Sequence, residues 1–298
     1  MNESIHPTYL QQIKQFYPDV TTDSLRVISD GLVNIVVIVN AERVFRFPRN
    51  DEWAMDLLRH EMRVLDLLRK HMTLSIPDCD IVTDDFVSYP LVQGDPCYRW
   101  DLLRLPDYQQ DRLAEQLAEF LTQMHGIPLD RVRTAGIGDS DVNRTREVRL
   151  KLFADVQAEL YPHMMPYSRD WVEAHFAPLL NDERFMAYNP VLINGDLSCY
   201  HILWDKPTAS LTGIIDFGTA GIGDPAADYG CLINTYGESF LARVAKYDSG
   251  VEATLDRARF WAGALELQWL LAGIRQNDPS WHTAHIGNAR DVAPIGTP

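Results

Sequence analysis

The sequence has little cysteine and comparatively little positive charge, and each scarcity narrows the classes of protein to consider. Its four cysteines are scattered and form no C-x-x-C pair, which is typical of free thiols in a reducing cytoplasm. Only 27 lysines and arginines stand against 42 acidic residues, which gives a net charge of −15. This balance argues against nucleic acid and anionic membranes as partners, and it is compatible with a small cationic partner.

Targeting segments, membrane spans and low-complexity runs are absent as well. The first ten residues lack the basic and apolar regions of a signal peptide, and no apolar run is long enough to span a bilayer. We therefore expect a cytoplasmic protein. The 298 residues are 46% hydrophobic, which permits one large domain or two lobes around a substantial core. The sequence does not indicate an oligomeric state.

The segment 191–218 contains three short apolar runs, each ended by turn-forming polar residues. The runs are 191–193, 201–204 and 211–215. Short runs bounded by Gly, Pro, Asn and Asp are typical of strands joined by tight turns. Such strands could hold Asp196, His201 and Asp216 at one end of a small sheet, around a shared pocket.

These three residue types suit phosphoryl transfer. One carboxylate must accept the proton of the attacking hydroxyl, and two further groups must hold Mg²⁺ against the nucleotide phosphates. The protein-kinase pattern is an Asp, an Asn five residues later, and then Asp-Phe-Gly. Here Asp196 stands at the base position, His201 follows five residues later, and Asp216 begins a literal D-F-G. Aspartates are common in turns, but three groups at these spacings favour the functional interpretation.

The segment 222–230, which reads IGDPAADYG, completes a pattern that resembles the aminoglycoside phosphotransferase family of antibiotic kinases. Within it, the sequence is most similar to aminoglycoside 2″-phosphotransferases and macrolide 2′-phosphotransferases, in which His follows the base. The family usually has His two residues before the base, whereas this chain has Asn194. An asparagine side chain can still form hydrogen bonds that hold the loop.

The resemblance extends over nearly the whole chain, and it is strongest at 191–230 and weak beyond 235. It implies an α+β, two-lobed protein-kinase-like fold. A small N-lobe with an antiparallel sheet, residues 1–93, would bind nucleotide and join the rest through a hinge near 88–94. A larger, mainly helical C-lobe, residues 95–298, would carry the catalytic loop and the substrate-binding region.

Two strands, 24–29 and 35–39, flank a turn with a single glycine. By resemblance this hairpin covers the nucleotide phosphates, and Ser29, Gly31 and Asn34 would line it. Without the rest of the pattern it would be an ordinary turn.

The alternating strand 43–48 carries Arg46 where kinases place a lysine that binds the phosphates. Arginine supplies the same charge with a different, forked geometry. Glu61 follows fifteen residues later, within a segment (55–70) whose apolar residues recur at helical spacing. We therefore expect an Arg46–Glu61 ion pair like the Lys–Glu pair of kinases.

The segment 86–94 is predicted to be a strand that runs into the hinge. By resemblance, backbone groups between Pro90 and Val92 would meet the purine, with Tyr89 behind it. With a bulky residue at that position, the chain resembles those relatives that favour GTP over ATP.

The remainder of the chain is predicted to be mainly helical. Helical patterns cover 109–126, 141–161, 170–180, 226–236 and 251–274. We interpret His125 as structural and Asp228 as a residue that stabilises the catalytic loop. The resemblance implies that acidic and tryptophan side chains near the C-terminus hold a cationic sugar. The candidates are Glu238, Glu266, Trp269, Asp278 and Trp281.

The predicted reaction transfers the γ-phosphoryl group of ATP or GTP to a hydroxyl of an aminoglycoside, with Mg²⁺ as cofactor. The acidic balance favours a polycationic aminoglycoside, and the resemblance implies the 2″ type. The Tyr-Pro hinge resembles macrolide 2′-phosphotransferases, so both acceptors stay open. A metabolic small-molecule kinase is a third possibility. A nucleotide-binding pseudokinase is a fourth, which Asn194 and Arg46 would support.

Overall fold

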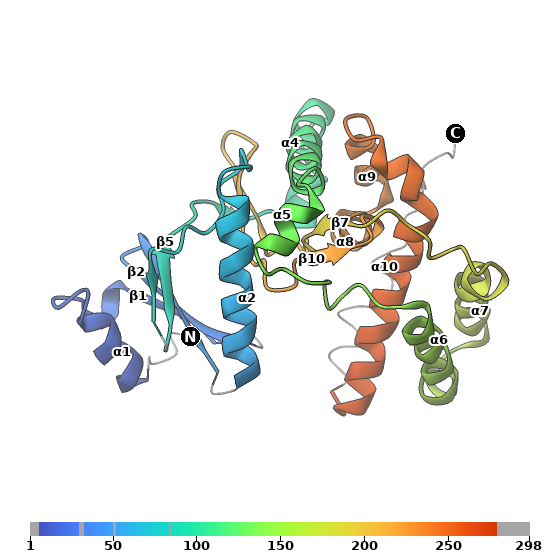
Figure 1. Cartoon of the computed structure of the whole chain (residues 1–298), viewed down its shortest axis with the longest axis horizontal. Coiled ribbons are helices and arrows are strands. Elements are labelled where there is room, and N and C mark those ends of the chain that lie inside the picture. The colour runs from blue at the N-terminus through green and yellow to red at the C-terminus, as the bar shows by residue number, and fades with distance from the viewer. Residues whose placement is uncertain (1–5, 30–32, 50–51, 84, 279–298) are drawn as a thin grey trace.

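The computed structural model describes residues 6–29, 33–49, 52–83 and 85–278. The five-stranded sheet and α2 lie at one end of the molecule and α6 and α7 at the other, with α4, α8 and α10 between them (Figure 1). The architecture is the predicted α+β, kinase-like fold.

The sheet at the N-terminal end is antiparallel throughout and has the strand order β1-β2-β3-β5-β4. Its strands are β1 (Leu25–Ile28), β2 (Asn34–Val39), β3 (Arg43–Pro48), β4 (Ile81–Val82) and β5 (Val87–Pro90). Alternating residues of β2 and β3, such as Val37 and Phe45, are fully buried. They pack with Ile13 of helix α1 (Pro7–Lys14), so one face of the sheet forms a small core of its own.

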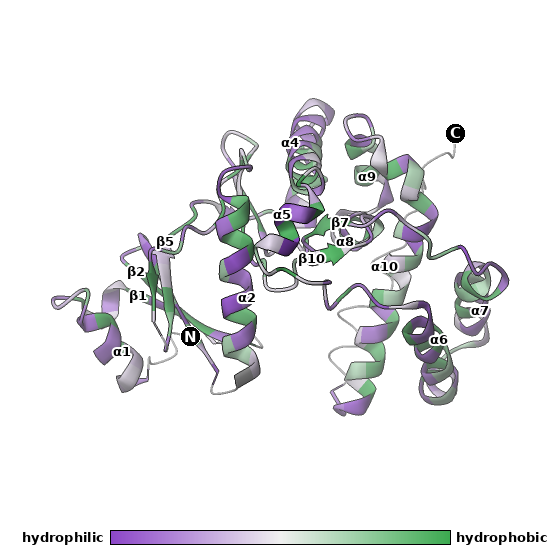
Figure 2. Ribbon diagram, viewed as in Figure 1, coloured by the Kyte–Doolittle hydropathy of each residue, from purple (hydrophilic) through white to green (hydrophobic). Residues whose placement is uncertain are grey.

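Helix α2 (Glu52–Leu68) connects this sheet to the main core. Val64, Leu65 and Leu68 belong to the same buried cluster as the helices of the C-terminal part. Hydrophobic and hydrophilic stretches alternate along α2 in Figure 2, as expected for a helix with one buried face.

The C-terminal part is mainly helical. Its α-helices are α3 (Arg99–Leu102), α4 (Asp107–His125), α5 (Leu129–Thr134), α6 (Arg146–Asp155), α7 (Pro166–Asn181), α8 (Ala226–Tyr236), α9 (Glu238–Val244) and α10 (Gly250–Arg275). A π-helical turn, Val156–Leu160, and a 3₁₀ turn, Tyr161–His163, follow α6, and a 3₁₀ turn, Thr22–Ser24, precedes β1. The long helical patterns of the sequence are confirmed, whereas the short α3 and α5 were not predicted.

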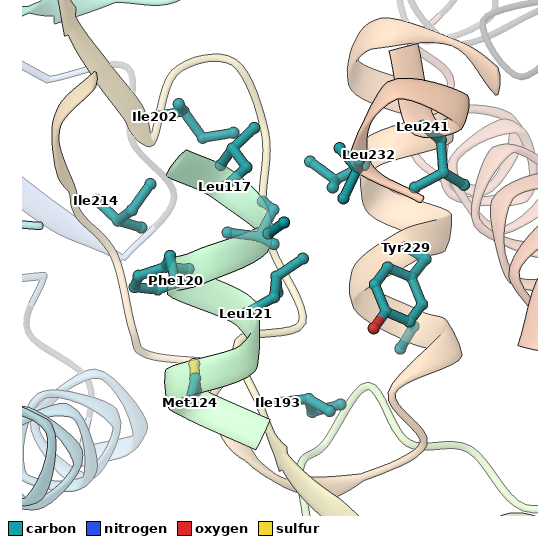
Figure 3. Close-up of a cluster of buried hydrophobic side chains, with 14 of the residues drawn as sticks. Leu117, Phe120, Leu121, Met124, Ile193, Ile202, Ile214, Tyr229, Leu232 and Leu241 are labelled. Atoms are coloured by element: carbon teal, nitrogen blue, oxygen red, sulfur yellow. The ribbon is translucent and has the colours of Figure 1, made fainter. Parts of the chain in front are cut away.

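Helix α4 forms the centre of the main core. Leu117, Phe120 and Leu121 are fully buried. Figure 3 shows them between the strand residues Ile202 and Ile214 on one side and Leu232 of α8 on the other. Burying each such side chain contributes about 1.5–3 kcal/mol, so this cluster fixes the strands that carry the candidate site.

The three apolar runs of 191–218 form strands, but they do not share one small sheet. β7 (Val191–Ile193) pairs with β10 (Gly221–Gly223), whereas β8 (Ile202–Asp205) pairs with β6 (Asp95–Pro96) and β9 (Ser210–Ile214). Glycine permits the β7–β10 pairing, because a Cβ atom on Gly223 would lie 2.6 Å from Cδ1 of Ile193. The expectation of a single sheet was wrong on this point.

The four cysteines are free, as predicted. Among the described residues, no helix combines the length and apolar character that crossing a membrane requires.

Candidate active site

The loop between β7 and β8 carries Asp196, and the amide of Asn194 holds it in place. Oδ1 of Asn194 accepts a hydrogen bond of 2.9 Å from the backbone N–H of Asp196. Nδ2 of Asn194 donates 3.3 Å to the carbonyl oxygen of Asp216. Asn194 is fully buried, so one side chain links the backbone of the predicted base to that of the D-F-G segment.

Asp228 of α8 stabilises the same loop through hydrogen bonds to its backbone. Its carboxylate accepts hydrogen bonds from the backbone N–H groups of Asn194, at 3.1 Å, and Gly195, at 2.7 Å. It also lies 2.9 Å from Nε2 of His125 at the end of α4. Gly195 has a φ of +80°, a conformation that favours glycine. A Cβ atom at this position would also lie only 2.7 Å from Cγ2 of Val142. The structural interpretations of Asp228 and His125 are confirmed.

His201 lies between the two aspartates. Its Nδ1 is 2.9 Å from the carbonyl oxygen of Asp196 and 3.5 Å from Oδ2 of the same residue. Its Nε2 is 3.6 Å from Oδ2 of Asp216. The structure therefore brings the three residues together, as their spacing predicts.

Both carboxylates remain accessible to a ligand. The side chain of Asp196 is 45% exposed and that of Asp216 is 42% exposed. The pKa of Asp196 is raised from its ordinary value, chiefly because surrounding protein partly removes the carboxyl group from water, and Asp216 raises it further. His201 opposes this shift. Asp216 has a φ of +64°, an uncommon left-handed conformation for a residue with a side chain.

The predicted ion pair between β3 and α2 is present. Nη1 of Arg46 lies 2.8 Å from the carboxylate oxygens of Glu61, and their side chains are only 11% and 2% exposed. Burial opposes the charge of Arg46, but Glu61, Tyr89 and Asp216 raise its pKa above the ordinary value. Glu61 also accepts a hydrogen bond of 3.1 Å from the backbone N–H of Phe217. One carboxylate thus joins the arginine to the D-F-G segment.

His201 and Asp216 supply a donor set that fits Mg²⁺ bound together with phosphate. Because a carbonyl oxygen only accepts, the contact with Asp196 places the proton of His201 on Nδ1 and leaves the Nε2 lone pair toward Asp216. Within the described residues, no group of three or more His, Cys, Asp and Glu side chains forms a metal cluster. Magnesium commonly takes one or two carboxylates from the protein and its other ligands from phosphate and water. Asp216 supplies such a carboxylate, and Nε2 of His201 supplies a second donor atom beside it.

The other residues predicted to bind nucleotide lie on or beside the sheet. Asn34 begins β2; its side chain is nearly buried, and its Oδ1 has no hydrogen-bond partner among the described residues. The carbonyl oxygen of Ser29 accepts from Arg49. Tyr89 is buried on β5, and burial raises its pKa. Gly31 lies outside the described residues.

At the predicted hinge, Pro90 is exposed and ends β5, whereas Val92 is buried. The contact of Pro90 and Val92 with a purine stays a prediction.

The predicted acceptor-binding residues come from α9, α10 and the segment after α10. Glu238 and Glu266 are both buried. The carboxylate of Glu238 forms an ion pair with Arg259, so its charge is balanced within the protein. Trp269 and Asp278 are partly exposed. Trp281 lies outside the described residues, and the role of all five stays a prediction.

Ser198 is a further site residue that the sequence did not indicate. It lies two residues after Asp196, and in the described part of the chain its buried hydroxyl oxygen has no hydrogen-bond partner. Buried hydroxyl groups normally have partners, so this hydroxyl is an exception within the loop that carries Asp196. Its only sequence signal is its distance from Asp196, because serine is common in loops.

The fold and this arrangement of side chains are those of a kinase-like phosphotransferase. The chain belongs to the phosphotransferase enzyme family (APH), whose model matches residues 24–261.

Two curated relatives are similar over part of their length. An uncharacterized protein, YcbJ of Bacillus subtilis (strain 168), is 27% identical over 213 residues, which are 68% of this chain and 66% of YcbJ. Viomycin phosphotransferase of Streptomyces vinaceus is 26% identical over 181 residues, 60% of each chain. The chain thus spans slightly less than two thirds of either relative.

Solved structures match over nearly their whole length. The GDP and kanamycin complex of APH(2″)-IIIa superposes with a TM-score of 0.81 at 30% identity, over 94% of this chain and 96% of that one. Macrolide 2′-phosphotransferase MphH from Brachybacterium faecium, as apoenzyme, has a TM-score of 0.68 at 22% identity, over 96% and 99%. The predicted membership of the aminoglycoside phosphotransferase family is therefore confirmed.

Proposed function

We propose that this phosphotransferase transfers the γ-phosphoryl group of ATP or GTP to a hydroxyl of an aminoglycoside, of the 2″ type. The observation that carries the proposal is the convergence of Asp196, His201 and Asp216, together with the Arg46–Glu61 pair that is bonded to the D-F-G backbone. Phosphoryl transfer requires a base, side chains that hold the metal ion, and a cation that binds the phosphates.

In the proposed mechanism, Asp196 orients the acceptor hydroxyl and takes its proton. The acceptor oxygen forms a bond to the γ-phosphorus while the bond from that phosphorus to the β,γ-bridging oxygen breaks, and the nucleoside diphosphate leaves. Arg46 binds the phosphates, and Glu61 fixes its position. His201 and Asp216 would hold Mg²⁺, which neutralises phosphate charge when bound.

The acceptor class rests on charge and on similarity. A net charge of −15 attracts a polycation, and the 30%-identical structure contains kanamycin and GDP. The presence of GDP there also supports GTP as a phosphoryl donor. The same proposal includes the division into lobes at residues 1–93 and 95–298 and, from the free cysteines, a cytoplasmic location.

A coupled nucleotide-consumption assay tests the function. Purified protein with Mg²⁺ is given ATP or GTP, side by side, and a panel of aminoglycosides and macrolides, and products are checked by mass for one added phosphoryl group. We expect turnover on aminoglycosides, and we expect Asp196→Asn to lower it by a factor of roughly 10²–10⁴ while nucleotide still binds.

Other outcomes overturn the proposal in distinguishable ways. Turnover on macrolides alone would assign the alternative acceptor, and turnover on neither panel but on a metabolite would assign a metabolic kinase. Nucleotide-dependent thermal stabilisation without turnover on any acceptor would indicate a pseudokinase. Full activity of the Asp196→Asn variant would remove Asp196 from the mechanism.

A further inference from the structure

Three aromatic side chains form an exposed cluster next to the catalytic loop: Tyr98, Trp100 and Tyr200, here called the aromatic platform. The rings of Tyr98 and Trp100 are stacked, with centroids 4.5 Å apart and an angle of 8° between the planes. Tyr200 meets Tyr98 edge to face, at 5.7 Å and 84°. Each pair has a favourable aromatic geometry, so the three rings form one surface.

The platform is fixed to the segment that carries the reacting groups. Tyr200 lies within the catalytic loop, directly before His201 and four residues after Asp196. Tyr98 follows Cys97, whose backbone N–H donates 2.8 Å to the carbonyl oxygen of Ile202. A molecule that contacts the platform therefore lies beside the loop on which the acceptor hydroxyl reacts.

Two of the three rings of the platform are largely exposed to solvent. Trp100 is 56% exposed and Tyr200 is 62% exposed. Tyr98 stacks on one face of the indole ring of Trp100, and Trp100 nevertheless stays more than half exposed. Neighbouring exposed aromatic side chains are characteristic of binding sites.

We propose that the aromatic platform binds an amino-sugar ring of the acceptor, an inference that rests on the proposed function. An indole face stacks on the C–H face of a pyranose and attracts an ammonium group by a cation–π interaction. The groups assigned to the nucleotide lie on the five-stranded sheet, on α2 and at the hinge, whereas Tyr200 of the platform lies in the same loop as the proposed base, Asp196. The platform thus sets the affinity for the acceptor and leaves that for the nucleotide unchanged.

Alanine variants of the two exposed rings test the proposal. In Trp100→Ala and Tyr200→Ala we expect the KM for the aminoglycoside to rise roughly fivefold to twentyfold, with the KM for nucleotide unchanged. Trp100→Phe should restore most of the affinity, because it keeps an aromatic face. The matched control is Trp53→Ala on α2, since Trp53 is 60% exposed and lies outside the platform.

The other possible results contradict either the role of the platform or the proposed function. If wild-type protein turns over aminoglycosides and both alanine variants keep the acceptor KM, the platform is not a binding site. A lowered melting temperature with both KM values unchanged would identify the platform as a purely structural cluster. A raised nucleotide KM would assign the rings to the nucleotide. Absence of wild-type turnover on every amino-sugar acceptor would overturn the proposed function itself.

Discussion

At the scale of single residues, Asn194 matters most for the candidate site, because it links Asp196 to Asp216. It stands where the family usually has histidine, and its amide supplies one acceptor to Asp196 and one donor to Asp216. A neutral imidazole also has one acceptor and one donor. The two side chains can therefore perform the same task, which removes one reason to regard the chain as inactive.

Substitution of Asn194 tests this interpretation. We expect Asn194→Ala to lower kcat roughly tenfold to a hundredfold, because loss of buried hydrogen bonds costs about 1–3 kcal/mol and frees the backbone of Asp196. Steady-state kinetics and thermal unfolding measure the effect. Asn194→His is the matched control and should keep more activity. Equal loss in both variants would show that the asparagine amide itself is required.

The sequence indicated the three residues of the candidate site but not the groups that hold them. Asp196, His201 and Asp216 have diagnostic spacings, and spacing can be seen without a structure. The hydroxyl of Ser198 and the hydrogen bonds of Asn194 depend on how the loop folds back on itself, for which no spacing rule exists. The candidate acceptor-binding carboxylates followed from the resemblance, which does not show ion pairs within the protein, and Glu238 is paired with Arg259.

At the scale of elements, α2 connects strand β3 to the D-F-G segment. Its apolar residues pack into the main core, whereas Glu61 bonds both Arg46 on β3 and the backbone of Phe217. A displacement of α2 therefore changes the arginine and the D-F-G segment together.

The variant Glu61→Gln tests the function of α2. The amide oxygen can still accept from the backbone of Phe217, but the buried Arg46 loses its counter-charge, which costs about 3 kcal/mol. We expect a lower melting temperature and a nucleotide KM raised roughly tenfold, with little change in acceptor KM. Glu115→Gln, an exposed residue on α4, is the control. A nucleotide KM equal to that of the control would mean that the pair does not serve the phosphates.

The sequence predicted the bounds of several helices and strands well, but it did not predict which strands pair with one another. Strand β3 and helix α8 have the predicted bounds, because periodicity and turn residues are local. The pairing of β7 with β10 joins segments about thirty residues apart. It depends on close approach at glycines, which a single sequence does not reveal.

At the scale of the whole molecule, paired surface charges join distant segments. Arg43 lowers the pKa of Asp80, Arg243 and Lys246 lower that of Asp111, and Lys151 and Arg275 lower that of Asp155. Since several of these pairs link residues more than 100 positions apart, they contribute to the stability of the complete fold.

Acid should therefore destabilise the protein in a defined window. Each lowered pKa gives stability that is fully present above the ordinary aspartate value of about 3.9 and is lost as pH falls through the lowered value. We expect the free energy of unfolding, measured by urea denaturation from pH 7 to 3, to fall at the acidic end. Asp111→Asn should make that fall less steep. An identical slope in this variant would remove Asp111 from the effect.

The left-handed backbone of Asp216 has a consequence for protein engineering. Its φ of +64° is a conformation that glycine adopts without steric cost, so the chain keeps a carboxylate where folding alone would prefer no side chain. A screen that selects only for heat resistance would accept Asp216→Gly, and it would enrich robust molecules that lack the proposed metal ligand. Such a screen needs a simultaneous selection for activity.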